Sequence, residues 1–260
     1  MSGPQRIAIA NQKGGVGKTT LTANLAVAWA QLGQRILAID VDPQNNLSDA
    51  LGKSLGDYPG SLRGVFLGEH EILDARLRDV GVPGLDVVCA GERFDRVNIT
   101  LATQVRREEF LARALEGQVD GYDRVLFDCP PDLGLLTVNA LVAADGVLVP
   151  IDMQDRNAWK GTAALLRSMR ELAESRIDVG VLAIVKTGAN ERLLAYKILE
   201  DVLPRFELPI AATEIPRAVA HDNAMIAGEP LILREPEHLA AVAYRRLADE
   251  LGQFAPVGVA

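Results

Sequence analysis

Residues 7–20 read IAIANQKGGVGKTT, and this stretch decides the fold class. The small apolar residues at 7–10 have the composition of a buried strand, and an apolar helical pattern begins at Lys18. The glycines between them allow backbone N–H groups to curl around a phosphate, and the start of the following helix favours negative charge. A strand, a glycine-rich loop and a helix in this order predict a phosphate-binding loop in an α/β protein.

Side chains of the loop add specific chemistry. Lys18 can reach the β- and γ-phosphate oxygens of a nucleotide, and the Thr19 hydroxyl can ligate Mg²⁺. A search for the strict pattern G-x-x-x-x-G-K-[ST] would miss this loop, because Gln12 occupies the first glycine position and Lys13 follows it. The residues assigned to nucleotide binding here are Gly14, Gly15, Val16, Gly17, Lys18, Thr19 and Thr20.

Apolar runs of strand length alternate with longer segments of helical period along the rest of the chain, which predicts a doubly wound, mostly parallel sheet flanked by helices. Predicted strands are 7–10, 35–41, 85–89, 124–128, 146–151, 179–185 and 209–212. Predicted helices are 18–32, 105–116, 134–143, 158–174, 191–202 and 237–251. Glycines and a proline break the pattern at 52–84, so loops and short helices are expected there. We expect a single domain over 1–260 with a frayed tail at 253–260.

Composition excludes several classes of protein. The 260 residues, 48% of them hydrophobic, can bury one large core, and no apolar run is long enough for a membrane span. With no signal-peptide pattern either, we expect a soluble, cytoplasmic protein. Cys89 and Cys129 lie too far apart for a zinc or iron–sulfur motif and are expected to be buried. His70, His221 and His238 are isolated and distant from the phosphate motifs in sequence, so no chemistry is assigned to them.

The loop resembles the deviant Walker A motif of the ParA/MinD group of P-loop ATPases. The segment Asp40-Val41-Asp42-Pro43-Gln44 is similar to the switch I region of this family, and residues 124–141 are similar to its Walker B and switch II region. The run Ile215-Pro216-Arg217 resembles the segment that packs near adenine. The resemblance extends from residue 6 to about residue 250 and is weakest at 52–105.

This resemblance implies an ATPase that uses ATP and Mg²⁺, with roles for particular residues. Mg²⁺ prefers oxygen ligands and retains water, and Thr19 and Asp128 match the family's ligand positions. Asp42 positions or activates the attacking water, while Asp40 supports the metal shell. Pro216 and Arg217 contact the base. An alternative for Asp40 and Asp42 is a helix-capping acidic pair before Pro43.

Lys13 matches the signature lysine of the family, which contacts the phosphates bound by the other subunit. Two nucleotides brought face to face repel strongly, and a cation supplied in trans offsets that repulsion. The resemblance therefore implies an ATP-dependent sandwich homodimer, in which Lys13, Lys18 and Asp42 form the catalytic set. The alternative for Lys13 is an ordinary solvated loop lysine.

Other branches of the superfamily fit less well. A cluster-carrying reductase needs cysteines at the dimer interface, and a ligase has no use for a trans lysine. A MinD-like protein ends in a basic amphipathic helix that lies on lipid, whereas residues 237–251 are mixed in charge and read as a helix packed on the domain. We therefore expect no membrane partner. The small ParA type remains, because only five residues precede Arg6 and no helix-turn-helix is expected there.

A ParA-like partition ATPase binds nonspecific DNA as an ATP dimer and is released when a ParB-like activator stimulates hydrolysis, so it associates with the nucleoid. The alternative is a related ATPase that positions a protein cargo through an adaptor. Two departures bear on this choice: residues 151–161 lack the usual aromatic-rich run, and Ala220 stands where a second arginine is common.

Candidate DNA contacts lie in the C-terminal third, and a solvated surface residue is the alternative for each. A chain with a net charge of −8 needs a concentrated basic patch to bind DNA. Arg192 is the first choice, because it opens a predicted helix at the ligand-bearing edge of the sheet. The candidates are Lys186, Arg192, Lys197, Arg205 and Arg217.

Overall fold

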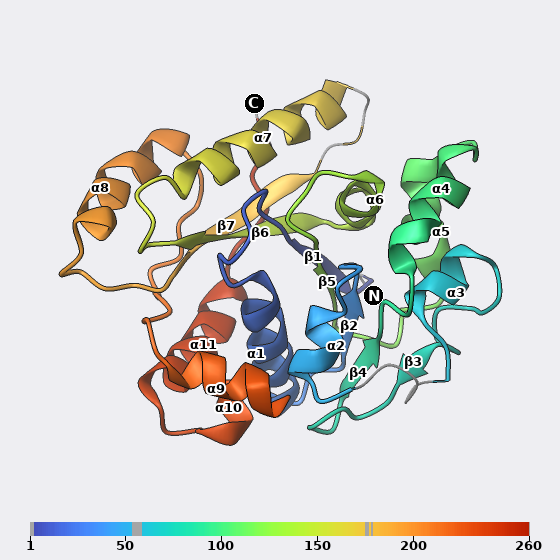
Figure 1. Cartoon of the computed structure of the whole chain (residues 1–260), viewed down its shortest axis with the longest axis horizontal. Helices are drawn as coiled ribbons and strands as arrows, with labels where there is room; N and C mark the ends of the chain where they lie inside the picture. Colours follow the sequence, from blue (N-terminus) through green and yellow to red (C-terminus); the bar gives the residue numbers. More distant parts are fainter. Residues whose placement is uncertain (1–2, 54–58, 175–176, 178, 260) are drawn as a thin grey trace.

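A seven-stranded sheet forms the centre of the protein, as seen in a computed structural model that describes residues 3–53, 59–174, 177 and 179–259 (Figure 1). The strand order is β3-β4-β2-β5-β1-β6-β7, and every neighbouring pair is parallel except β3 with β4. The predicted doubly wound, mostly parallel architecture is confirmed. The strands are β1 (Gln5–Ile9), β2 (Ile36–Asp40), β3 (Arg76–Leu77), β4 (Leu85–Val88), β5 (Arg124–Asp128), β6 (Gly146–Asp152) and β7 (Gly180–Thr187).

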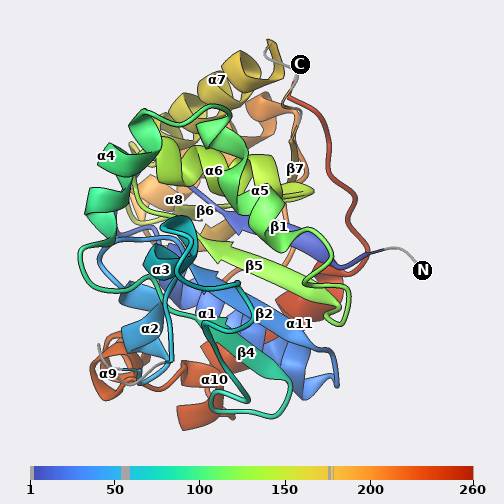
Figure 2. The same ribbon diagram turned by 90° about the vertical axis from the view of Figure 1, so that its right-hand side faces the viewer.

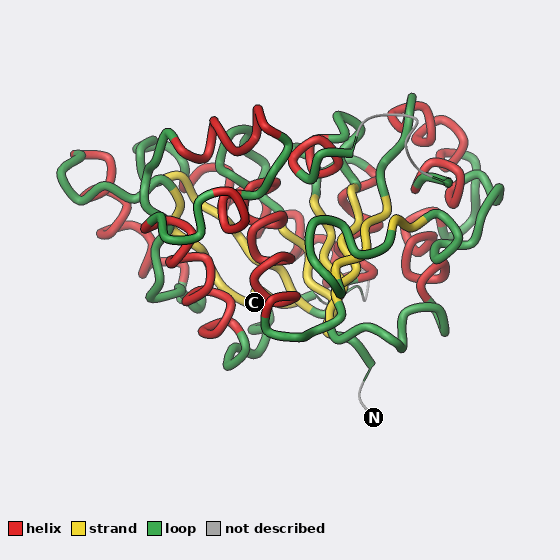
Figure 3. Tube along the Cα trace, turned by 90° about the horizontal axis from the view of Figure 1, so that it is seen from below, coloured by secondary structure: helices red, strands yellow, loops and turns green. Residues whose placement is uncertain are grey.

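Helices cover both faces of this sheet (Figures 1 and 2). The α-helices are α1 (Lys18–Gln31), α2 (Asn46–Ala50), α3 (Leu62–Phe66), α4 (Val97–Ala102), α5 (Phe110–Leu115), α6 (Leu135–Ala143), α7 (Trp159–Glu174), α8 (Leu194–Val202), α9 (Ala220–Ala227), α10 (Leu231–Arg234) and α11 (Leu239–Leu251). Short 3₁₀ helices are η1 (Phe94–Arg96), η2 (Arg107–Glu109) and η3 (Leu203–Phe206). The strands run between the two helical layers in the view from below (Figure 3).

A hydrophobic core lies on each face of the sheet, between the strands and the helices that cover them. There are two cores because successive side chains of a strand point to opposite faces. Ile7 and Ile9 pack with α1 and α11, whereas Ala8 and Ala10 face the core that α6 and α7 cover. Trp29, the largest buried side chain of α1, donates its Nε1–H to the carbonyl oxygen of Ala248 in α11 at 3.0 Å. Both cysteines, Cys89 and Cys129, are buried and unpaired.

Three strand ends meet at one edge of the sheet and position the site. In the register of the sheet Asp128, the last residue of β5, lies beside Ile9 on one side and Asp40 on the other. The glycine loop follows Ile9 directly, so the loop and both aspartates share the carboxyl edge, where parallel sheets hold their ligands.

Several elements differ from the sequence prediction. Residues 209–212 form no strand, because only Ile210 makes a bridge to β7. The irregular region 52–84 contains α3 and β3, which have too few residues to show a period, while 54–58 lie outside the described residues. The expected frayed tail packs instead: Val257 exchanges two backbone hydrogen bonds with Val181, at 2.8 and 2.9 Å, although residue 260 lies outside the described part. No helix in the described part of the chain could cross a membrane.

Candidate nucleotide site

The loop between β1 and α1 adopts a backbone that glycine favours. Gly15 and Gly17 have φ angles of +75° and +86°, which strain any residue with a Cβ. Gly17 is the N-cap of α1, and Thr187 at the end of β7 donates a hydrogen bond to the carbonyl oxygen of Val16 at 2.9 Å. This hydrogen bond joins the loop to the end of β7, and α1 begins directly after Gly17.

Lys18, the first residue of α1, points into the loop. Its ammonium donates to the carbonyl oxygens of Lys13 at 3.1 Å and Asn11 at 3.4 Å, and only 7% of the residue is exposed. Burial lowers the pKa of Lys18, and the nearby carboxylates of Asp128 and Asp42 oppose that change only in part. Because the Lys18 ammonium is held only by neutral carbonyl oxygens, it can exchange them for the phosphate oxygens of a nucleotide.

Asp128 lies against the first turn of α1 and is fully buried. It accepts hydrogen bonds from the hydroxyls of Thr19 at 2.7 Å and Thr22 at 3.1 Å. Burial raises the pKa of Asp128, and the charge of Asp42 adds to the rise, while the two hydroxyls counteract it. A cation placed beside Thr19 and Asp128 would relieve the electrostatic cost of this buried carboxylate.

Asp40 and Asp42 frame the end of β2 but face different partners. Asp40 is fully buried, and its carboxylate accepts bonds from the backbone and the hydroxyl of Ser48 in α2, at 3.0 and 2.9 Å. Its other oxygen accepts the Asp42 backbone N–H at 3.2 Å. Through these bonds Asp40 anchors α2 and the Asp42 loop, while its expected support of the metal shell stays a prediction.

The carboxylate of Asp42 accepts bonds from the Gln44 backbone at 3.0 Å and the Asn46 side chain at 3.3 Å. Neither donor carries a charge, and Asp42 is 5% exposed. Each oxygen therefore keeps a lone pair that can accept a hydrogen bond from a water molecule.

The donor set fits Mg²⁺ bound together with a nucleotide. Among the described residues no three acidic, cysteine or histidine side chains converge to form a complete metal cage. Mg²⁺ is commonly held by one or two protein oxygens, with substrate phosphates and water completing the octahedron. Thr19 and Asp128, already 2.7 Å apart, supply such a pair.

A pocket of about 260 Å³ continues from the glycine loop toward the C-terminal segment. Its loop side is formed by Gly15, Val16, Gly17 and Thr20. The far wall consists of Asp152, Gln154, Thr187, Gly188, Ile215, Arg217, Ala218, His221, Asp222 and Tyr244. The position of this pocket, beyond the phosphate loop, suits the base and ribose of a nucleotide. Arg217 contributes to this wall, whereas Pro216 faces a different hollow, beside Leu239. Contact of Arg217 with a base stays a prediction.

His221 corrects one expectation. The sequence places all three histidines away from the phosphate motifs, but α9 folds beside the loop and brings His221 into the pocket wall. Its ring nitrogen Nε2 lies 3.1 Å from the hydroxyl of Tyr244, which is buried. Nothing in the sequence near His221 signals this position, because the contact joins residues from two helices.

Lys13 leaves the loop in a different direction from Lys18. Its ammonium forms an ion pair with Asp155, in the turn between β6 and α7. The start of α7 packs closely on the same loop: a Cβ at Gly161 would lie 2.9 Å from the Cβ of Lys13. The sequence carries no local signal for Asp155, because its partner Lys13 is distant along the chain.

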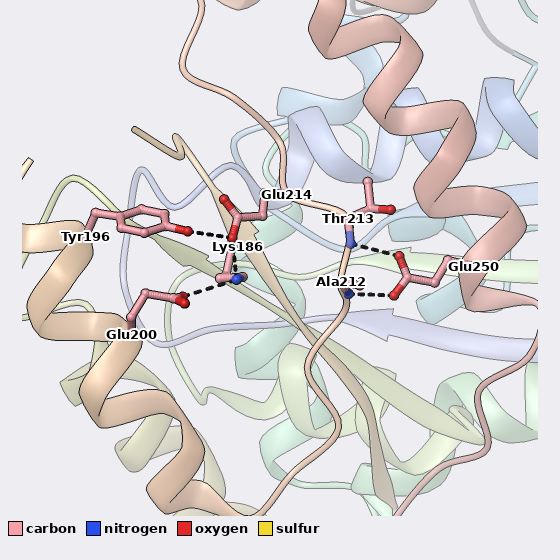
Figure 4. Close-up of polar contacts among 7 residues, drawn as sticks. All are labelled: Lys186, Tyr196, Glu200, Ala212, Thr213, Glu214 and Glu250. Atoms are coloured by element: carbon pink, nitrogen blue, oxygen red, sulfur yellow. Dashed lines mark hydrogen bonds and ion pairs between the residues drawn. The ribbon is translucent and has the colours of Figure 1, made fainter. Parts of the chain in front are cut away.

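Lys186 is not an exposed DNA contact, which corrects the sequence analysis. Its side chain, on β7, is 11% exposed and forms ion pairs with Glu200 of α8 and with Glu214 (Figure 4). Burial lowers the pKa of Lys186, but hydrogen bonds to Glu214 and Glu200 outweigh burial and raise it overall. Tyr196 of α8 also donates to Glu214, at 2.8 Å.

The four other candidate contacts are exposed. Arg192 precedes α8 instead of opening it, and its backbone N–H binds the side-chain oxygen of Asn190 at 3.2 Å. Lys197 lies on α8, Arg205 lies in η3, and Arg217 borders the pocket.

The segment that forms the pocket wall is held from two sides. Glu250 of α11 accepts hydrogen bonds from the backbone N–H groups of Ala212 at 2.6 Å and Thr213 at 2.9 Å (Figure 4). On the other side, Lys186 binds Glu214, and its carbonyl oxygen accepts the Ile215 N–H at 2.9 Å. These contacts hold the segment that supplies Ile215 and Arg217 to the pocket wall.

Comparisons with known proteins agree with this geometry. The family model for an AAA domain matches residues 4–180. The sporulation initiation inhibitor protein Soj of Bacillus subtilis is 36% identical over 247 residues, covering 94% of this chain and 97% of Soj. The chromosome partitioning protein ParA of Caulobacter vibrioides is 38% identical over 251 residues, covering 94% and 92%. This chain belongs to the ParA/MinD superfamily of P-loop ATPases.

Solved structures resemble the chain over nearly its whole length. Cobyrinic acid a,c-diamide synthase from Mycobacterium smegmatis, with a bound ATP analogue and magnesium, has a TM-score of 0.82 and 33% identity, covering 98% of this chain and 99% of the other. The cell division ATPase MinD of Pyrococcus furiosus has a TM-score of 0.78 and 26% identity, covering 96% and 98%. The glycine loop of this chain is therefore the P-loop of a ParA/MinD ATPase.

Proposed function

We propose that this ParA/MinD-superfamily chain is a ParA-like partition ATPase, which binds Mg-ATP, dimerises around it and attaches to DNA without sequence preference. The observation that carries the proposal is the divergence of two lysines at one loop. Lys18 turns inward to two carbonyl oxygens, while Lys13 turns away from the loop interior to an acid on the β6–α7 turn. Lys18 is thus placed to bind the nucleotide of its own chain, and Lys13 remains to bind the nucleotide of a second chain.

The P-loop residues bind and orient the nucleotide. The backbone from Gly14 to Thr20 surrounds the phosphates, and Lys18 exchanges its two carbonyl partners for phosphate oxygens. Thr19 and Asp128 hold Mg²⁺, which neutralises phosphate charge when bound. Asp42 accepts a hydrogen bond from the attacking water and orients it. Asp40 keeps the Asp42 loop in place by accepting the Asp42 backbone N–H, and it holds α2 through Ser48. Arg217 and His221 border the base.

Lys13 makes the site dependent on a second protomer. Its ion pair with Asp155 has to open before the ammonium can reach phosphates on another chain. Both side chains are partly exposed, although the Lys13 ammonium itself is buried. The homodimer is therefore favoured only when the partner's phosphates replace the carboxylate of Asp155.

In the cell this ATPase is cytoplasmic and associates with the nucleoid, and a ParB-like activator stimulates hydrolysis and releases it. Relatives named as chromosome partitioning proteins, aligned over more than nine-tenths of this chain, support that role. A related role, in which an adaptor replaces the centromere-binding partner and the cargo is a protein assembly, uses the same cycle. The identity of the co-purifying partner distinguishes the two roles.

Light scattering with a slowly hydrolysed ATP analogue tests the dimer. The wild-type chain should double its mass with the analogue and stay monomeric with ADP. Lys13→Ala should bind the analogue through Lys18 yet remain monomeric, whereas Lys18→Ala should lose nucleotide binding itself. A Lys13→Ala chain that dimerises as fully as the wild type would remove the argument for a trans contact.

DNA binding is tested separately by gel shift on unrelated duplexes. Binding should require the ATP analogue and should not depend on sequence, because it relies on phosphate charge. Equal binding with ADP, or a strong preference for one duplex, would contradict the proposal.

A further inference from the structure

Asn45 closes the turn that carries Asp42, and its backbone has a left-handed conformation. Its φ and ψ angles are +56° and +28°, and its N–H donates to the Asp42 carbonyl oxygen at 3.0 Å. Asp42 and Asn45 are therefore the two ends of one β-turn, with Pro43 in the second position, which proline favours. Among residues with a side chain, asparagine is one of the few that adopt the left-handed conformation routinely. The Asn45 side chain makes no capping bond to α2, so its amide is available for other partners.

The Asn45 amide forms hydrogen bonds with both polar backbone groups of Gly91, in the connection that follows β4. Its Oδ1 accepts the Gly91 N–H at 2.9 Å, and its Nδ2 donates to the Gly91 carbonyl oxygen at 3.4 Å. The same Nδ2 donates to the carbonyl oxygen of Pro43 at 3.3 Å, within the turn. Asn45 is 7% exposed, so these bonds are largely shielded from water. The amide thus joins the Asp42 turn to a segment that is 46 residues away in the sequence.

Gly91 is itself held closely by its neighbours. Its φ angle is +96°, and a Cβ at Gly91 would lie 2.6 Å from the Cβ of Ser61, the N-cap of α3. Two residues before Gly91, the Cys89 carbonyl oxygen accepts the N–H of Leu62 at 2.8 Å, at the start of α3. The connection after β4 therefore packs directly on α3. Asn45 attaches the Asp42 turn to this packed segment.

The other contacts of the turn show why this attachment matters. Both donors to the Asp42 carboxylate belong to the same loop, so they orient the carboxylate within the loop but do not fix the loop on the sheet. The Asp42 N–H, which Asp40 accepts, holds the side of the turn nearer to β2. Ser48 also binds Asp40 and thereby holds α2. The side of the turn nearer to α2 is held by Asn45 through Gly91.

We propose that Asn45 is a positioning residue for ATP hydrolysis, because its amide fixes the Asp42 turn against Gly91. This inference rests on the proposed role of Asp42, which is to orient the attacking water. Without the amide the turn can shift, and a displacement of about 1 Å at an orienting group can slow a reaction roughly a hundredfold. The P-loop and Lys18 belong to the segment that joins β1 to α1, so ATP binding should change little. Asn45 therefore acts on the rate of hydrolysis and not on the affinity for ATP.

The test replaces Asn45 by glycine, which keeps the left-handed backbone and removes the amide. Asn45→Gly should lower kcat roughly ten- to a hundredfold, while the affinity for a slowly hydrolysed ATP analogue stays within about twofold of the wild type. Phosphate release measures kcat, and equilibrium binding of the analogue measures affinity. Thermal unfolding shows how far each substitution affects the fold itself.

Asp79→Gly is a matched control at the other edge of the sheet. Asp79 also has a left-handed backbone, with a φ angle of +51°, and its side chain also accepts a backbone N–H, that of Gly84 at 2.8 Å. It lies between β3 and β4, before the first residues of the parallel strands β2 and β4, which pair at Ile36 and Leu85. Asp79→Gly should therefore leave kcat and analogue affinity unchanged.

A double-mutant cycle shows whether Asn45 acts through Asp42. If it does, Asp42→Ala/Asn45→Gly should hydrolyse ATP no more slowly than Asp42→Ala alone, because the residue that Asn45 positions is already absent. If Asn45→Gly does not fold, Asn45→Asp takes its place in every comparison. Aspartate tolerates the left-handed conformation and keeps the acceptor for the Gly91 N–H, but it loses the Nδ2 donor.

Each outcome decides a different point. A wild-type kcat for Asn45→Gly would overturn the inference, and so would weakened analogue binding, an equal fall in kcat for Asp79→Gly or a further fall in the double variant. A slow Asp42→Ala beside a normal Asn45→Gly would remove this inference and leave the proposed role of Asp42 in place. If Asp42→Ala hydrolyses ATP as fast as the wild type, the proposed role of Asp42 fails and this inference fails with it.

Discussion

Asp42 is the residue on which hydrolysis should depend most. It is buried beside the P-loop, and its two neutral donors leave it able to accept a hydrogen bond from water. Asp42→Ala should still bind Mg-ATP, should release phosphate roughly a hundredfold more slowly and should accumulate as the dimer. Phosphate release and light scattering measure both effects, with Asp49→Ala, an exposed acid of α2, as the control.

If Asp42→Ala hydrolyses ATP at the wild-type rate, another group orients the attacking water. Reduced nucleotide binding by the same variant would mean that Asp42 holds the metal or the phosphates instead.

At the residue level, the sequence predicted what the backbone dictates and missed what side chains from distant segments supply. The glycine loop, Lys18 and Thr19 follow from a local pattern, and Asp128 follows from the resemblance of residues 124–141 to the family's Walker B region. Thr187, His221 and Asp155 carry no local signal, because each acquires its partner only through folding. Lys186 is a candidate DNA contact in the sequence because it lies in the C-terminal third, but in the structure two glutamates make its burial possible.

At the level of elements, the Lys186 cluster joins β7, α8 and the pocket wall. Lys186→Met should lower the free energy of unfolding by about 1–3 kcal/mol, because Glu214 and Glu200 lose their counter-ion while staying partly solvated. Urea unfolding measures the change. The control Lys197→Met removes an exposed lysine of α8 and should change the free energy by less than about 0.5 kcal/mol. Equal effects of the two substitutions would show that the cluster adds nothing to stability.

The elements themselves could be predicted where they are long and periodic. The six predicted helices and the central strands are present, although 105–116 is divided into η2 and α5, and α8 starts three residues later than expected. Short helices such as α2 and α10 have too few residues to show a period, and their positions depend on tertiary contacts such as that of Ser48 with Asp40. Residues 209–212 have the composition of a strand but make a single bridge, because the chain turns away from β7 to build the pocket wall.

The stability of the whole molecule should depend on pH through His221. Burial lowers the pKa of His221 from its ordinary value of 6.5, so the unfolded chain binds a proton at a higher pH than the folded chain does. The contribution of His221 to stability is therefore complete above pH 6.5 and is lost as the pH falls toward the pKa of the folded state. Urea unfolding at several pH values below 6.5 should show a slope that His221→Gln flattens.

His70→Gln, which changes an exposed histidine, is the control and should leave the slope of the wild type unchanged. A His221→Gln chain with the full wild-type slope would mean that other groups are responsible.

The covering of β7 affects how the molecule behaves at high concentration. β7 is an edge strand, yet Val257 pairs with Val181, residues 209–211 pair with Ile184, and Ile215 binds Lys186. Pro256 closes the remaining space so tightly that a Cβ at Gly146 or Gly180 would lie 2.8 or 2.9 Å from it. An uncovered edge is a template on which other chains can add strands and aggregate. The C-terminal segment thus protects the β7 edge from pairing with other chains. A truncation before Gln253 would expose the backbone of Val181 at this edge and would leave the P-loop residues in place.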